Sequence, residues 1–202
     1  MSRQQEGGDG RSAVRIPLFP REDMSDAQRA VYQAIVNGPR GKVVGPLRAA
    51  LHAPELADRW QKLGELLRYR TSLPPRLSEL AILVVARHWD SQFEWYAHAP
   101  IAEKVGLPAG MIEAIRTGAL AATPHPADQV VLAYSAELLR EHSVRDATYA
   151  AARELLGDTG IVELTALVGY YSMVALTLNA HEIPLPPGTQ PPLPPRRAAT
   201  DK

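Results

Sequence analysis

The sequence contains no cysteine among its 202 residues. This absence excludes disulfide bonds, thiol peroxidase chemistry, iron–sulfur clusters and cysteine-ligated zinc. An excess of one charge is also missing, because 22 basic residues balance 22 acidic residues. A balanced chain lacks the basic face that nucleic-acid binding requires, and it has no general attraction to an anionic membrane surface. We therefore expect no nucleic acid and no membrane among its partners.

We expect neither a leader sequence nor a membrane-spanning segment in this chain. Residues 1–10 are polar and contain no apolar core of the kind that a signal peptide has. Residues 164–180 carry no charge, but the run is shorter than the roughly 20 residues that span a bilayer. We expect this run to form a buried helix, and we expect the protein to be cytoplasmic.

Strand patterns are lacking, whereas helix signals recur along the whole chain. Ser25 is a typical N-cap residue, and prolines precede or begin several amphipathic or apolar stretches. The expected helices cover residues 25–37, 54–68, 76–89, 91 onward, 108–118, 126–141, 145–156 and 160–179. The sequence thus predicts an all-α fold, a single-domain bundle of about six to eight helices.

The two ends of the chain differ in composition from its middle. We expect residues 1–24 to be a flexible N-terminal segment and residues 25–183 to form the helical domain. Residues 184–202 are rich in proline, which predicts an extended C-terminal tail near the polyproline II conformation. The segment from Pro191 to Arg196 has the spacing of a PxxPxR ligand, but we favour a simple tail or an arm over a neighbouring subunit.

The richest polar cluster lies at the start of the helix that follows residue 91. Ser91, Glu94 and His98 have the spacing of residues on one helical face. A carboxylate four residues from a histidine can orient the imidazole, so we expect Glu94 to hold His98 for acid/base chemistry. Glu79 lies within an apolar helix, where burial raises the pKa of a carboxyl group. The same Glu–His spacing is also common on solvated helix faces.

The cluster is a weak metal site. Glu94 and His98 supply only two ligands, and a third would have to come from Glu79, His88 or His181. The chain contains no HExxH motif. We therefore expect no metal and no other cofactor, and a metal-assisted enzyme using Glu94 and His98 is one alternative.

Several segments together resemble the carboxymuconolactone decarboxylase family, which includes the AhpD-like alkylhydroperoxidases. The resemblance covers about residues 45–185 and implies an AhpD-like helical bundle. The segments that carry it are PRLSELAIL from Pro75, QFEWYAH from Gln92, GLP from Gly106, IEAI from Ile112, VEL from Val162 and GYY from Gly169.

The resemblance implies that this chain is not a thiol peroxidase. The peroxidase branch uses a glutamate, a CxxC motif and a histidine as a proton relay for a redox-active dithiol. Glu79 and His98 match the glutamate and the histidine, but Ser91 and Glu94 occupy the two cysteine positions. A hydroxyl group and a carboxyl group cannot cycle through a disulfide.

The decarboxylase branch needs no cysteine, and Glu94 and His98 match its Glu–His spacing. The resemblance implies a cofactor-independent carboxy-lyase or related acid/base enzyme for a small carboxylated lactone or unsaturated keto acid. In that mechanism His98 is the proton shuttle, Glu94 is its orienting partner and Glu79 is a buried acid. Arg87 is the candidate for binding the substrate carboxylate, with Ser91 beside it, and a structural salt bridge is an equal alternative for Arg87.

The resemblance also implies a homo-oligomer, a trimer or a hexamer, with sites near the subunit interfaces. A non-catalytic oligomeric or binding protein on the same scaffold is a further alternative. Residues 1–68 add a segment that the shorter decarboxylases of the family do not have.

Overall fold

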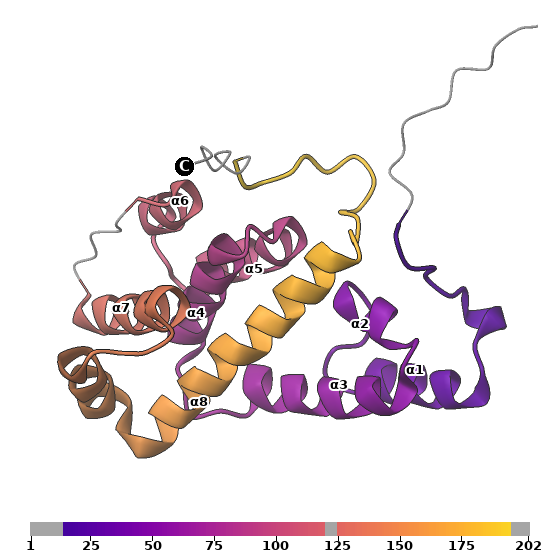
Figure 1. Ribbon diagram of the computed structural model, residues 1–202, viewed down its shortest axis with the longest axis horizontal. Helices are drawn as coiled ribbons and strands as arrows, with labels where there is room; N and C mark the ends of the chain where they lie inside the picture. The colour runs from indigo at the N-terminus through magenta and orange to yellow at the C-terminus, as the bar shows by residue number, and fades with distance from the viewer. Residues whose placement is uncertain (1–13, 120–124, 195–202) are drawn as a thin grey trace, which may run out of the picture.

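The part of the chain that the structure describes is built from helices alone. The computed structural model describes residues 14–119 and 125–194. These residues form one short 3-10 helix and eight α-helices, with no strand (Figure 1). The elements are η1 (Arg21–Asp23), α1 (Asp26–Asn37), α2 (Pro46–Ala50), α3 (Pro54–Tyr69), α4 (Pro75–His88), α5 (Gln92–Lys104), α6 (Ala109–Thr117), α7 (Pro126–Glu141) and α8 (Asp146–Ala180). The predicted all-α, single-domain bundle is confirmed.

Local sequence signals explain most of the helix boundaries. Ser25 and Gln28 form a reciprocal capping box at the start of α1, and α2, α3, α4 and α7 each carry proline in the first turn. Gly157 has φ 68° and ψ 178°, which interrupts α8 where the sequence predicts a helix end. The short elements η1 and α2 were not predicted, because three to five residues are too few to show a helical period.

Helix α4 forms the centre of the bundle. Every residue from Leu77 to Ala86 is buried, and α4 packs against α5, α7 and α8. Figure 1 shows α8 as a long diagonal, with α4 and α7 on one side of it and α2 and α3 on the other. By length and composition α8 could cross a membrane, but half of its most apolar window is buried within the chain.

Two buried carboxylates link α7 to neighbouring helices through hydrogen bonds. Asp128 is fully buried and accepts two hydrogen bonds from Arg76 of α4, at 2.8 and 2.7 Å. Glu137 accepts hydrogen bonds from the Arg145 backbone and side chain and from the Thr148 hydroxyl. These carboxylates connect α7 to α4 and to the first turn of α8.

Both terminal segments lie on the helical domain where they are described. In the N-terminal segment, the partly buried Val14, Ile16, Leu18 and Phe19 pack against the core. At the other end, residues 184–194 run back toward α6 (Figure 1), and the buried Leu193 exchanges backbone hydrogen bonds with the Gln92 side chain. This arm lies on its own chain. Residues 1–13 and 195–202, which include the end of the PxxPxR motif, lie outside the described residues.

Candidate active site

A sharp turn between α4 and α5 brings the predicted catalytic residues together. Asp90 adopts a left-handed conformation with φ 49°, and Arg87 forms an ion pair with its side chain. The Ser91 amide then donates a hydrogen bond to the Ala86 carbonyl at 2.8 Å. The chain therefore reverses within a few residues, and α5 packs against α4.

The partner that holds His98 is Glu79, not Glu94. His98 Nδ1 lies 2.8 Å from Glu79 Oε2, and both side chains are more than nine-tenths buried. The sequence predicted Glu94 as this partner from its spacing of four residues on one helix. That prediction is wrong, because the packing of α5 on α4 places Glu79 within hydrogen-bond distance of the imidazole. The ring of Tyr171 from α8 meets the His98 ring edge-on, with 5.1 Å between the centroids.

Glu94 takes the role of buried acid that the sequence assigned to Glu79. Its side chain is 1% exposed, and neither carboxyl oxygen has a hydrogen-bond partner. Burial raises the pKa of Glu94 well above its ordinary value of 4.5, because the charged form loses its hydration and gains no compensating contact. Glu94 is therefore a neutral proton donor over a range of pH in which an exposed glutamate is ionised.

A cavity of about 170 Å³ gives Glu94 and His98 access to a small molecule. Its walls combine α5 with residues of the α1–α2 connection, α2, α3 and α8. The other lining residues are mainly cationic, aromatic or aliphatic: Arg40, Lys42, Val44, Pro46, Leu47, Arg68, Tyr69, Phe93, Ala97, Tyr170, Tyr171, Val174 and Leu178. Glu79 does not line this cavity and acts on it through His98.

Three cations of the cavity were missed by sequence reasoning. Arg40 and Lys42 lie in the connection between α1 and α2, and Arg68 lies near the end of α3. None of them forms an ion pair within residues 14–119 and 125–194. Arginine and lysine without carboxylate partners beside a cavity favour an anionic ligand.

A glycine on α3 makes room for one of these cations. Arg40 Nη2 donates a hydrogen bond to the Tyr170 hydroxyl at 3.4 Å. A Cβ atom at Gly64 would overlap both that hydroxyl and the Arg40 guanidinium. Glycine weakens a helix interior by about 1 kcal/mol relative to alanine, so its presence in α3 fits a requirement for this close approach. A glycine within an amphipathic helix was the one signal in the sequence that pointed here.

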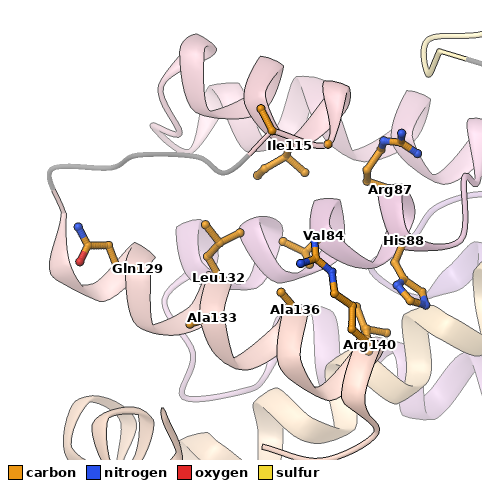
Figure 2. Close-up of a pocket in the computed structure, with 12 residues that line it drawn as sticks. Val84, Arg87, His88, Ile115, Gln129, Leu132, Ala133, Ala136 and Arg140 are labelled. Carbon is orange, nitrogen blue, oxygen red and sulfur yellow. The ribbon is translucent and has the colours of Figure 1, made fainter. Parts of the chain in front are cut away.

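Arg87 and Ser91 do not lie where the sequence predicted. Arg87 lines a second cavity of about 470 Å³ between α4, α6 and α7 (Figure 2), so it is not the carboxylate-binding residue of the Glu94 cavity. Ser91 is fully buried at the N-cap of α5, and it lines neither cavity. Both residues are at the α4–α5 turn, whose reversal turns them away from the cavity that Glu94 and His98 share.

Potential metal ligands are sparse around the site. The described part of the chain holds no group of three or more His, Asp or Glu side chains placed to bind a metal ion. His88 lines the other cavity, and His181 follows the last turn of α8. The pair of Glu94 and His98 therefore gains no third ligand from the residues considered for that role.

The fold is that of AhpD-like proteins. An uncharacterised peroxidase-related protein from Ralstonia eutropha JMP134, described as an alkylhydroperoxidase AhpD core, matches 87% of this chain and 93% of its own, with a TM-score of 0.69 and 14% identity. An uncharacterised peroxidase-related protein from Silicibacter sp. TM1040 matches 84% of this chain and 90% of its own, with a TM-score of 0.66 and 15% identity. No curated protein matches the chain.

The sequence match agrees with the fold. Residues 54–137 match the carboxymuconolactone decarboxylase family. This range includes Glu79, Glu94 and His98, whereas Arg40, Lys42 and Tyr170 lie outside it. Residues 54–137 are thus similar to the carboxymuconolactone decarboxylase family, and the fold is that of AhpD-like proteins, which supports the resemblance found in the sequence.

Proposed function

We propose that this protein is a cofactor-independent acid/base lyase, a decarboxylase or a closely related enzyme. Its substrate is a small carboxylated lactone or an unsaturated keto acid. The observation that carries the proposal is Glu94, a buried carboxyl group without a hydrogen-bond partner that lines a cavity beside His98. Unpartnered buried polar groups are costly and concentrate at functional sites.

The cationic side chains of the cavity can bind an anionic substrate. Arg40, Lys42 and Arg68 can bind the carboxylate of the substrate and the oxygen on which negative charge develops. The aromatic and aliphatic residues of the wall exclude water from the remainder of the molecule. A volume of about 170 Å³ restricts the site to small substrates.

The reaction needs no electron acceptor besides the substrate. The bond between carbon and the carboxylate breaks, carbon dioxide leaves, and the electron pair passes into the conjugated carbonyl group. Glu94 then gives its proton to carbon. His98 lies one helical turn from Glu94 and returns a proton from water to the Glu94 carboxylate.

Glu79 acts as the positioning residue in this scheme. Its carboxyl group holds His98 Nδ1 and fixes the orientation of the ring, so that Nε2 is the nitrogen that exchanges protons. The burial of Tyr171 raises the pKa of its hydroxyl group, with Arg68 acting in the opposite direction and Glu79 and Glu94 in the same one. The phenol therefore remains neutral against the imidazole.

The absence of cysteine supports a lyase over a peroxidase on this scaffold. Ser91 and Glu94 stand at the positions of the dithiol, and the chain contains no other thiol that could replace it. The peroxidase-related descriptions of the structural neighbours therefore do not carry over to a thiol mechanism in this chain.

The test is a panel of carboxylated lactones and unsaturated keto acids, followed by proton NMR in D₂O. We expect turnover to place one deuterium on the carbon that loses carbon dioxide. Glu94→Gln and His98→Ala should each lower kcat at least about 100-fold, because each removes one proton-transfer group. Glu103→Gln, an exposed substitution on the same helix, is the matched control and should keep full activity.

Two outcomes would contradict the proposal. Turnover that persists in both Glu94→Gln and His98→Ala would place the chemistry at other residues. An absence of turnover with every acid of the panel would favour the non-catalytic binding protein. The cations are tested separately, because Arg68→Gln should raise KM for an acid substrate far more than for its methyl ester.

We also propose that the protein is a cytoplasmic homo-oligomer, a trimer or a hexamer. Support for self-association comes from α8, where the large apolar residues Val162, Met173 and Leu176 are 67%, 36% and 47% exposed and lie on one helical face. Contiguous exposed apolar residues are typical of interaction surfaces. Light scattering of the wild type and of Val162→Glu would test this assembly, since the charge should dissociate it.

A further inference from the structure

A second cavity lies on the other side of α4, and the proposed reaction does not use it. It has a volume of about 470 Å³ and is enclosed by α4, α6 and α7 (Figure 2). It shares no lining residue with the cavity that contains Glu94. Its size falls in the range of about 300 to 1,000 Å³ that small-molecule sites have.

Most of the wall of this second cavity is aliphatic. Val84 of α4 faces Ile115 of α6 and Leu132 of α7, and Figure 2 shows these side chains around the same space. Ala133 and Ala136 of α7 also line it, and their short side chains leave the space open. Such a wall suits the apolar body of a ligand.

The polar groups of the second cavity gather at one end. Figure 2 shows Arg87, His88 and Arg140 at that end, with Gln129 at the other. Among the described residues that line this cavity, none is an aspartate or a glutamate. The charged end is therefore cationic, in contrast to the neutral balance of the whole chain.

Both arginines have N–H groups that can still donate hydrogen bonds to a ligand. Arg87 uses Nη1 in its ion pair with Asp90, while its Nε is buried without a hydrogen-bond partner. Arg140 is exposed, and no ion pair of Arg140 occurs in the part of the chain that the structure describes. Guanidinium groups recognise carboxylates through paired N–H donors.

We propose that this second cavity is a binding site for a carboxylate with an apolar body. The carboxylate lies between Arg87 and Arg140, and the apolar body lies along Val84, Ile115 and Leu132. This assignment gives Arg87 an anion-binding role, but in a site other than the one that the sequence suggested. It is independent of the proposed lyase reaction.

Octanoate is the probe, and 1-octanol is the uncharged control for it. Isothermal titration of the full chain should detect octanoate binding. 1-Octanol should bind at least about tenfold more weakly, because a charge-assisted hydrogen bond is lost. Arg140→Gln should lower the affinity for octanoate by a similar factor. Arg48→Gln removes the same charge from an exposed site outside both cavities and should leave binding unchanged.

A unique thiol locates the probe. Because the chain has no cysteine, Ala136→Cys places a single thiol in the wall of the second cavity. Octanoate should protect this thiol from alkylation, and 1-octanol should protect it much less. A single thiol at Ala97 in the Glu94 cavity is the comparison and should gain no protection.

Three results would overturn the assignment. The first is octanoate binding that Arg140→Gln leaves unchanged. The second is protection at Ala97→Cys in place of Ala136→Cys, which would put the probe in the Glu94 cavity. The third is a thiol at Ala136→Cys that cannot be alkylated in the folded protein without ligand, since a neighbouring copy would then cover the cavity. Lyase activity does not enter any of these outcomes.

Discussion

The buried carboxylates of α7 and the buried carboxyl group of α5 have opposite surroundings. Asp128 on α7 accepts two hydrogen bonds from Arg76, and Glu137 on the same helix accepts hydrogen bonds from Arg145 and Thr148. Glu94 on α5 accepts none. Carboxylates of the first kind hold helices together, whereas a carboxyl group of the second kind keeps its proton and weakens the fold at high pH. A buried acidic side chain thus links helices in one region, whereas in the other it is the proton donor of the reaction that we propose.

The largest effect is expected where a structural pair is broken. Arg76→Met removes both hydrogen bonds to Asp128 and leaves a buried carboxylate without its cation. We expect a loss of about 3 to 5 kcal/mol in the free energy of unfolding, measured by urea denaturation at pH 7. The double variant Arg76→Met/Asp128→Asn removes the charge as well and should recover much of that loss. An unchanged midpoint in the single variant would mean that the pair is not needed for stability.

The buried Glu94 should make the free energy of unfolding depend on pH in the opposite sense to a paired carboxylate. The folded-state pKa lies above the ordinary value of 4.5, so the folded protein retains a proton that the unfolded chain releases. Stability should therefore fall as the pH rises from about 4.5 to the raised pKa, with a limiting slope of about 1.4 kcal/mol per pH unit. Glu94→Gln should lack this component, and the difference between the two unfolding curves measures it. A flat difference would show that Glu94 ionises normally.

The Arg40–Tyr170 contact in the cavity depends on Gly64. Gly64→Ala adds a methyl group where the Tyr170 hydroxyl and the Arg40 guanidinium lie. Overpacking costs about 1 to 3 kcal/mol, and the better helix propensity of alanine offsets about 1 kcal/mol of it. We expect a net destabilisation of about 1 kcal/mol by thermal unfolding, together with a raised KM for an acid substrate. Gly110→Ala on α6 meets no neighbouring atom and should change neither quantity.

The smallest effect is expected at Glu137. Hydrogen bonds from Arg145 lower the pKa of Glu137 from 4.5 to about 2. The contribution of Glu137 to stability is therefore present above about pH 4.5 and is lost as the pH falls toward about 2. Glu137→Gln should remove this acid-dependent component, which urea unfolding between these pH values would detect. Because Arg145 is largely exposed, we expect the change to be small and to shrink in high salt.

Much of the fold was predictable because its signals are local. N-cap serine, proline in first turns and the glycine at position 157 mark boundaries that depend on a few adjacent residues. The central position of α4 followed from an apolar run that continues around the whole helix. Helix α2 was missed, since its five residues show no period, and its burial depends on contacts with α3 and α8.

Only part of the candidate site was predictable in its residues, and its pairing was not. Glu79, Glu94 and His98 were recognised from their spacing and their family resemblance. Which glutamate holds His98 depends on how α5 packs against α4, and no spacing along one helix contains that information. Arg40 and Arg68 come to the cavity from different elements, so only the tertiary structure brings them to Glu94.

The most direct test of the central claim is the protonation state of Glu94 at pH values above its ordinary pKa of 4.5. Infrared difference spectroscopy between the wild type and Glu94→Gln in D₂O reports the C=O stretch of a protonated carboxyl group. We predict that the wild type keeps this band at pH values where an exposed glutamate is already a carboxylate, and that Glu94→Gln lacks it. A band that is lost in step with the ionisation of an exposed glutamate would contradict the account.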